Sequence, residues 1–170
     1  MKADRSRIND TYQAMREHGY EIILDERFLI LKSFVQHRTS NTYDHCLNVT
    51  RIALNMAKKL RIKVDIRSLV RGCLLHDYYG YAWRDTKPRW HGHRHPRLAA
   101  KNAQRDFGIN ALEENMILGH MWPINFFRFF KSREAFILTI ADKMATLEEV
   151  FAPRGEYEGY RLKLRRAEIF

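Results

Sequence analysis

Apolar residues recur in steps of three and four along most of the chain, a spacing that places them on one face of an α-helix. A first helix is predicted over Ser6–His18, closed by Gly19, because glycine takes the left-handed conformation that ends helices. A second helix is predicted from Asp25. Its apolar face comprises Phe28, Leu31 and Val35.

The middle of the chain predicts two longer helices. Thr42 is expected to cap the first, whose apolar face is formed by Cys46, Val49, Ala53, Met56 and Leu60. The second begins near Asp65, and its apolar face leads on to the adjacent pair His76 and Asp77. Residues 78–94 then have no usable period, and a connection of this length is more often functional than a plain link.

The C-terminal half predicts further helices and no strand pair. Pro96 is expected in the first turn of a helix that stops near Gly108, and Asn110 to cap a helix that reaches His120. Ser132 starts an apolar helix through Leu147, and a last, basic helix is predicted over residues 156–170. The pattern therefore predicts an all-α, orthogonal bundle of six to eight helices, in one domain over residues 1–170 with its motif-bearing core at about 41–150.

Composition narrows the class of protein. Hydrophobic residues make up 45% and charged residues 29% of the 170, an ordinary globular balance, and no apolar run approaches the length of a membrane span. Residues 1–10 lack the apolar core of a signal peptide, so we expect a cytoplasmic protein in which Cys46 and Cys73 are reduced. A net charge of +10 favours a polyanionic partner, but charge alone does not choose among a phosphate ester, nucleic acid and a membrane surface.

Acidic and histidine side chains fall on inward faces of the predicted helices. Asp77 and Asp142 continue apolar rows, and a buried carboxylate is costly unless a cation meets it. Three lone histidines lie on similar rows or at a helix start: His45, His95 and His120. Together with His76, four imidazoles and two carboxylates suffice to hold two divalent metal ions bridged by a carboxylate, with Mn, Fe, Co or Ni expected and Zn or Mg as alternatives.

The order of these residues resembles the HD-domain superfamily of metal-dependent phosphohydrolases. Its signature is a lone His, an adjacent His-Asp pair and a distant Asp, matched here by His45, by His76 with Asp77, and by Asp142 in similar local sequence over residues 41–150. Members that hold two metals have two more histidines between the pair and the last Asp. His95 and His120 match them, so the resemblance favours a binuclear site over a mononuclear one.

Departures from the family's better-known branches disfavour some substrates. Mononuclear nucleotidases have a catalytic Glu where this chain has Gly80, and the Gly-Tyr-Pro signature of cyclic-dinucleotide cleavage is missing. The acidic pair that follows His-Asp in enzymes acting on guanosine tetraphosphate is missing too. The expected substrate is therefore another small phosphorylated compound, a nucleotide or a metabolite.

The resemblance and the loop composition assign further roles. Asp77 is expected to bridge the metals or accept a proton, and His91 to protonate the leaving group. Four basic residues lie close to the ligands in sequence and are expected to bind phosphate: Arg84, Lys87, Arg89 and Lys143. A solvated basic flap is the alternative for the loop residues.

Two other functions stay open at the level of sequence. One is an HD-type di-iron oxygenase, which uses the same six-ligand set. The other is a basic module that binds nucleic acid and holds a structural metal, although the chain has no known nucleic-acid motif. The aromatic run Phe126, Phe127, Phe129 and Phe130 is expected to belong to the core or to a homodimer contact, with a substrate lid or a membrane-touching patch as alternatives.

Overall fold

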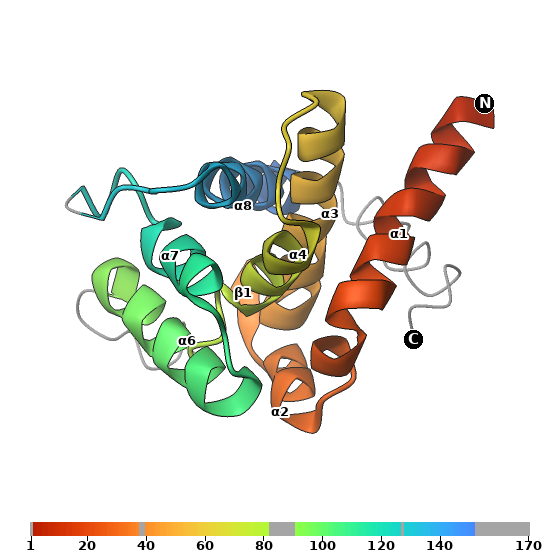
Figure 1. The fold of residues 1–170 in the computed structure, drawn as a ribbon. Helices are drawn as coiled ribbons and strands as arrows, with labels where there is room; N and C mark the ends of the chain where they lie inside the picture. The colour runs from red at the N-terminus through yellow and green to blue at the C-terminus, as the bar shows by residue number, and fades with distance from the viewer. Residues whose placement is uncertain (1, 38–39, 82–90, 127, 152–170) are drawn as a thin grey trace.

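The computed structural model describes residues 2–37, 40–81, 91–126 and 128–151 (Figure 1). Its elements are α1 (Lys2–Ile23), α2 (Glu26–Leu29), the 3-10 helix η1 (Ile30–Ser33), β1 (Val35–His37), β2 (Ser40–Asn41), α3 (Thr42–Lys59), α4 (Ile66–Leu75), α6 (His91–Phe107), α7 (Ala111–Gly119) and α8 (Arg133–Phe151). Seven α-helices in this part of the chain confirm the predicted all-α bundle.

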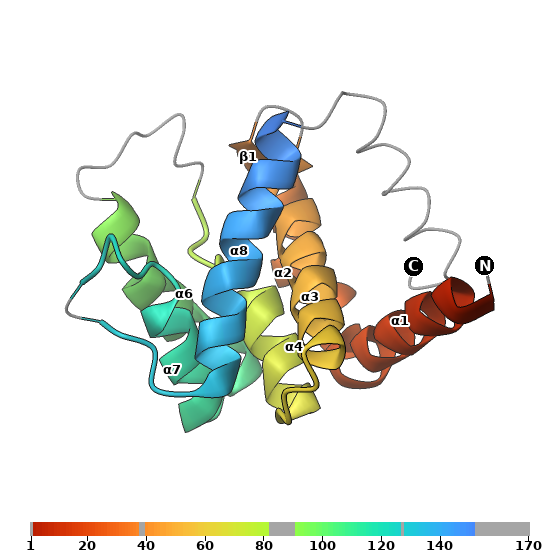
Figure 2. The same cartoon turned by 90° about the horizontal axis from the view of Figure 1, so that it is seen from above.

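Helices α3 and α4 form the centre of the bundle. Helix α8 packs along α3, α1 packs on α4, and α7 joins α4, α6 and α8 (Figures 1 and 2). The largest fully buried side chains come from these helices and from α2 and η1 between them, among them Tyr43, Phe28, Leu47 and Leu74. The apolar rows read from the sequence thus meet in one core, and the inward charged residues lie at its edge between α3, α4, α7 and α8.

Polar caps start the helices that present the site. The side chains of Asp65 and Asn110 accept the backbone N–H of the third helical residue, and Asn110 forms a capping box with Glu113. The Asn110 cap and a helix start near Asp65 were predicted. The prediction for Thr42 is wrong by one residue: Asn41 is the N-cap, accepting from the N–H of Asp44. Thr42 instead donates its hydroxyl to Gln36, 3.1 Å away, which fixes the chain beside the site.

Helix α1 does not end at Gly19 as predicted but continues to Ile23. A Cβ at Gly19 would lie 2.7 Å from Cδ1 of Leu74 and 3.0 Å from Cγ1 of Val70. Glycine is needed here because α1 crosses α4 closely, and not because the backbone turns. The sequence pattern does not distinguish these two reasons.

The segment between η1 and α3 also differs from the prediction. The sequence pattern places Val35 on the apolar face of the helix that begins at Asp25. In the structure η1 ends at Ser33, and Val35 lies in strand β1 and is 55% exposed. Strands β1 and β2 pair antiparallel, with His37 opposite Ser40, so the prediction of no strand pair is wrong. Strands of three and two residues are too short to show a period of two, which explains why the pattern missed them.

Helix α6 begins at His91, so Pro96 lies inside it and not in its first turn. The start of α6 was missed because its first residues are polar and the apolar period begins only at Leu98. Helix α6 ends at Phe107, beside Gly108 with φ of +57°, and Ser132 caps α8 by accepting the N–H of Ala135; both were predicted. The helix predicted over residues 156–170 lies outside the described residues.

Two further predictions concern the surface and the membrane. Phe126 and Phe129 are 71% and 53% exposed, so they are not core residues of this chain, whereas Phe130 is half-buried against the core. Phe127 lies outside the described residues. No helix in the described part of the chain is long and apolar enough to span a bilayer.

Candidate metal centre

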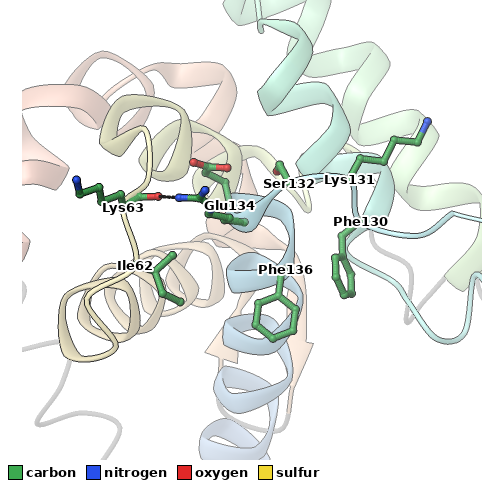
Figure 3. A pocket seen from close by; sticks show the side chains of 8 residues that line it. Ile62, Lys63, Phe130, Lys131, Ser132, Glu134 and Phe136 are labelled. Carbon is green, nitrogen blue, oxygen red and sulfur yellow. Dashed lines mark hydrogen bonds between the residues drawn. The ribbon is translucent and has the colours of Figure 1, made fainter.

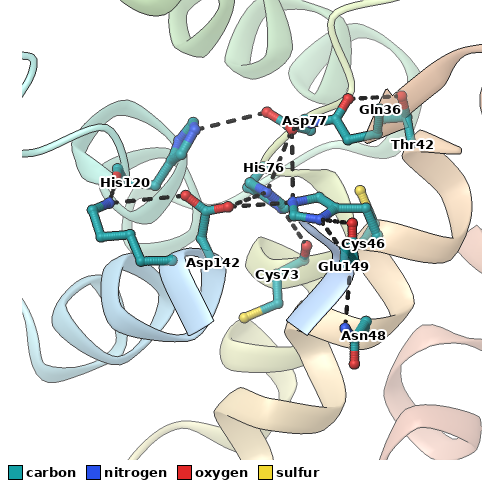
Figure 4. Close-up of polar contacts among 12 residues, drawn as sticks. Gln36, Thr42, Cys46, Asn48, Cys73, His76, Asp77, His120, Asp142 and Glu149 are labelled. Atoms are coloured by element: carbon teal, nitrogen blue, oxygen red, sulfur yellow. Dashed lines mark hydrogen bonds and ion pairs between the residues drawn. The ribbon is translucent and has the colours of Figure 1, made fainter. Parts of the chain in front are cut away.

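Six predicted ligand residues come together from five helices. His45 lies in the first turns of α3, His76 and Asp77 directly follow α4, and the others come from α6, α7 and α8: His95, His120 and Asp142. The four imidazoles and Asp77 are at most 5% exposed. The inward rows predicted from sequence therefore do converge, and they do so where the ends of α4 and α7 meet the side of α8 (Figure 4).

One group of ligands surrounds Asp142. Its Oδ1 lies 3.2 Å from Nε2 of His45 and 3.8 Å from Nε2 of His76. Each of the three residues offers one ligand atom, and these atoms all lie within 4.8 Å of one another. Two imidazole nitrogens and a carboxylate oxygen at this spacing form a set that suits a divalent transition metal.

Asp77 connects this group to a second one. Its Oδ2 lies 3.7 Å from Nε2 of His76 and 4.0 Å from Nε2 of His45, on the side of the first group. Its Oδ1 lies 3.3 Å from Nε2 of His95 and 3.7 Å from Nε2 of His120. The two oxygens of one carboxylate thus face two different pairs of histidines.

Hydrogen bonds at the rear of two imidazoles fix which nitrogen faces the centre. Nδ1 of His76 lies 2.8 Å from the carbonyl of Cys73, and Nδ1 of His120 lies 2.7 Å from the carbonyl of Ile117. Because a carbonyl only accepts, Nδ1 must be the protonated nitrogen of each neutral ring, and Nε2 presents a lone pair. This backing is typical of metal-ligating histidines.

Two polar atoms at the centre are buried and have no hydrogen-bond partner. They are Nε2 of His76 and Oδ1 of Asp77, the only such side-chain atoms among the described residues. Leaving such atoms unpaired costs about 1–3 kcal/mol each. A lone pair and a carboxylate oxygen that face one cavity are what a metal cation satisfies, so these residues fit a metal.

Glu149 is a part of the site that the sequence analysis missed. It is 1% exposed on α8 and accepts from Nδ1 of His45, with Nδ1 to Oε distances of 3.0 and 3.1 Å. Ser40 donates to it at 2.7 Å, and Asn48 donates to it at 3.3 Å, as Figure 4 shows for Asn48. Glu149 follows Asp142 by seven residues, which is two helical turns, so its spacing was a signal that the sequence offered.

Gln36 is the second missed residue, and its amide is oriented without ambiguity. Nε2 donates to Oδ2 of Asp77 at 2.7 Å, because an ionised carboxylate only accepts, and Oε1 accepts hydroxyls from Thr42 at 3.1 Å and Tyr79 at 2.9 Å. Figure 4 shows Thr42, Gln36 and Asp77 in this chain of hydrogen bonds. This chain of hydrogen bonds holds the Asp77 carboxylate in place. No sequence signal marks Gln36, because it reaches the site from the short strand β1.

Burial and mutual charge determine the ionisation of these groups. Burial alone would raise the pKa of Asp77, but the surrounding histidines outweigh it and hold the pKa at about 2. Burial, helped by His95 and His76, lowers the pKa of His120 to about 3, so this ring is neutral near pH 7. Burial opposes protonation of His45 as well, but Glu149 and Asp142 raise its pKa well above the usual value. Metal binding must therefore displace a proton from His45.

Of the four predicted phosphate-binding residues, only Lys143 lies in the described part of the chain. Nζ of Lys143 lies 3.1 Å from the carbonyl of His120 and 3.9 Å from Oδ2 of Asp142, at the edge of the centre, and burial lowers its pKa. Arg84, Lys87 and Arg89 lie outside the described residues, and so does the side chain of His91. Their roles stay predictions. Cys46 and Cys73 are free and buried, as expected.

Comparison with known proteins identifies the family. The HD domain family matches residues 42–147, which include all six candidate ligands, so the chain belongs to the HD domain family. This is a family of metal-dependent phosphohydrolases, and the chain has His and Asp groups able to hold a metal. No curated protein and no solved structure matches the chain.

Proposed function

We propose that this protein hydrolyses a small phosphorylated compound, a nucleotide or another metabolite, with two divalent metal ions. The arrangement of Asp77 is the observation that supports two ions. Its Oδ2 faces His45 and His76 while its Oδ1 faces His95 and His120, at 3.3 to 4.0 Å. Asp142 completes the first group.

Each residue has a role that follows from its contacts. Bound metal ions supply Lewis acidity, which polarises a phosphoryl oxygen and activates water near neutral pH. His76 and His120 present Nε2 lone pairs and His45 does so once its proton is displaced, while Asp77 lies between the two groups and Gln36 keeps its carboxylate in one orientation. Lys143 provides a cation at the edge of the centre, where its Nζ can meet a phosphate oxygen. His91 is proposed to protonate the leaving group.

The direct test is phosphate release from a panel of nucleotides and sugar phosphates by the protein loaded with Mn²⁺. Asp77→Asn keeps the size of the side chain but removes the bridging charge, and it should abolish release. Asp10→Asn is the matched control, because Asp10 is half exposed and pairs with Lys58 far from the centre. Its activity should equal that of the wild type.

Two results would contradict the proposal. Equal activity in the Asp77→Asn and wild-type proteins would show that the centre does not perform the reaction. No phosphate release from any substrate, together with oxygen consumption by the Fe²⁺-loaded protein, would assign the same ligands to an oxygenase.

A further inference from the structure

Two segments that are far apart in the sequence meet at one end of the bundle. One is the turn between α3 and α4, and the other is the connection from α7 to α8. Nη1 of Arg133, the first residue of α8, donates to the carbonyl of Lys63 in the turn at 3.3 Å. A pocket of about 650 Å³ lies between the two segments, lined by Ile62 and Lys63 on one side and by Phe130 and Lys131 on the other (Figure 3). The two segments therefore form one continuous surface.

This surface is strongly basic. Residues 58–67 contain five basic residues and one acidic residue, and residues 121–133 contain three basic residues and no acidic one. The chain as a whole has 30 basic residues against 20 acidic ones, so positive charge is concentrated at this end. Five of the basic residues are exposed: Lys59, Arg61, Lys63, Lys131 and Arg133.

The acidic side chains of the turn and of the start of α8 are used inside the fold. The carboxylate of Asp65 accepts a backbone N–H at 2.6 Å and caps α4. Glu134, which is 8% exposed, accepts the N–H of Asp65 at 3.0 Å. Among the described residues, no carboxylate pairs with Arg61, Lys63 or Lys131, so these cations lack an internal counter-charge.

Large apolar side chains lie among these cations. Phe129 is 53% exposed and Phe136, on α8, is 39% exposed. Phe129 stacks on Phe130 at a ring separation of 4.0 Å, and Phe130 lies 5.1 Å from Phe136, so the three rings form one cluster. An exposed apolar cluster that is bordered by charged side chains is typical of an interaction site, and here the border is cationic.

A bilayer that contains anionic lipid satisfies both features at once. Its headgroups neutralise the cations, and its interface accepts aromatic side chains. A second copy of the chain would bring the same positive charge against this surface, which disfavours self-association. Single-stranded nucleic acid would neutralise the cations, but it binds by stacking bases on separate aromatic side chains. Here Phe129 already stacks on Phe130 and contacts Trp122 edge-on at 5.4 Å.

We propose that the surface around Lys63, Phe129 and Lys131 binds a membrane that contains anionic lipid. The two lysines contact the headgroups, and the ring of Phe129 enters the interface beside them. The α3–α4 turn lies apart from the metal ligand His45, because His45 and Lys59 are near opposite ends of α3, about 21 Å apart along the helix at 1.5 Å per residue. Substitutions in the turn therefore leave the ligands in place.

The test is sedimentation of the full-length protein with lipid vesicles. The wild type should sediment with vesicles of phosphatidylcholine and phosphatidylglycerol, and it should stay in the supernatant with phosphatidylcholine alone. Lys63→Gln combined with Lys131→Gln should weaken binding about 25-fold, because each basic residue near an anionic surface strengthens binding about fivefold. Arg16→Gln combined with Lys101→Gln is the matched control, because both residues are exposed but lie on α1 and α6. This control removes the same charge and should bind within about twofold of the wild type.

The aromatic part of the surface has its own test. Phe129→Ser should weaken binding to the anionic vesicles about tenfold, because an apolar ring no longer leaves water for the interface. Phe151→Ser is the matched control and should bind like the wild type, since Phe151 is 77% exposed at the opposite end of α8. Circular dichroism should show the same helix content in all variants, so that lost binding reports the surface and not the fold.

Three results would overturn the proposal. A wild type that does not sediment with anionic vesicles would exclude membrane binding. Equal losses in the Lys63 and Lys131 variant and in the Arg16 and Lys101 variant would assign binding to the net charge of the chain and not to this surface. Tighter binding to a single-stranded polynucleotide than to anionic vesicles, weakened by the same two lysine substitutions, would assign the surface to nucleic acid.

Discussion

Replacing Glu149 by Gln tests whether the carboxylate behind His45 is part of the metal centre. Glu149 accepts a hydrogen bond from Nδ1 of His45 at 3.0 Å in a buried setting, so it fixes the ring with Nε2 turned to Asp142. Gln keeps the shape of the side chain but loses the charge, and its amide group is a donor that competes for the same partners.

The expected loss of metal affinity follows from the contribution of a residue that orients a metal-ligating histidine. Loss of a residue that orients a metal-ligating histidine typically lowers metal affinity by about 10-fold to 100-fold. That range corresponds to about 1.4 to 2.7 kcal/mol of binding free energy, because each tenfold change is about 1.36 kcal/mol. In the proposed two-ion site, the loss should fall on an ion bound at His45, His76 and Asp142, and an ion bound on the side of His95 and His120 should keep its affinity.

Titration of the metal-free protein with Co²⁺, followed by calorimetry and by the absorption of the bound ion, resolves the two sites. Glu148→Gln is the matched control on the preceding residue of α8, because Glu148 is 50% exposed and pairs with Arg51 at 2.8 Å. Equal Co²⁺ affinity in the Glu149→Gln and Glu148→Gln proteins would refute the role of Glu149 in positioning His45.

Three more predictions concern stability. Gly19→Val should lower the free energy of unfolding by about 1–3 kcal/mol in urea, because its Cβ would lie 2.7 Å from Leu74. Asn110→Ala should cost about 1 kcal/mol in the same assay, because α7 loses its cap and the capping box with Glu113. Removing metal with a chelator should lower the melting temperature of the wild type, since a ligand at about 100 times its Kd stabilises by about 2.7 kcal/mol, and should lower that of Asp77→Asn by less.

Two exposed positions control for the helix substitutions. Glu21→Val introduces the same residue on the solvent side of α1, and Glu114→Ala removes a side chain from the first turns of α7 without touching the cap. Both should change stability by less than about 0.5 kcal/mol. A Gly19→Val protein as stable as Glu21→Val would contradict the close packing of α1 on α4, and an Asn110→Ala protein as stable as Glu114→Ala would contradict the cap.

Local signals in the sequence were sufficient where neighbouring residues decide the structure. Residues within one or two turns decide the Asn110 cap, the start of α4 near Asp65, the end of α6 beside Gly108 and the apolar rows of α3 and α4. The Gly19 error and the missed strands have another origin. There the structure is set by contacts with α4 and with the start of α3, which are distant in sequence.

The residues of the candidate site also fall into two groups, those predictable from local spacing and those placed by contacts distant in sequence. His45 and Asp142 were recognised because they lie on apolar rows of long helices, and both reach the centre. Glu149 lies on the same row as Asp142 two turns later and was predictable from spacing alone. Gln36 was not predictable, because a lone polar residue in a three-residue strand has no pattern around it. Only the fold shows that it donates to Asp77 at 2.7 Å.

The most direct test of the central claim is the number of metal ions per chain, measured by mass spectrometry on freshly purified wild type and Asp77→Asn. The wild type should hold about two transition-metal ions per chain, and the substitution at the bridging carboxylate should remove at least one of them. A wild type that holds no metal above background, even after incubation with Mn²⁺ or Fe²⁺, would contradict a metal centre built on Asp77.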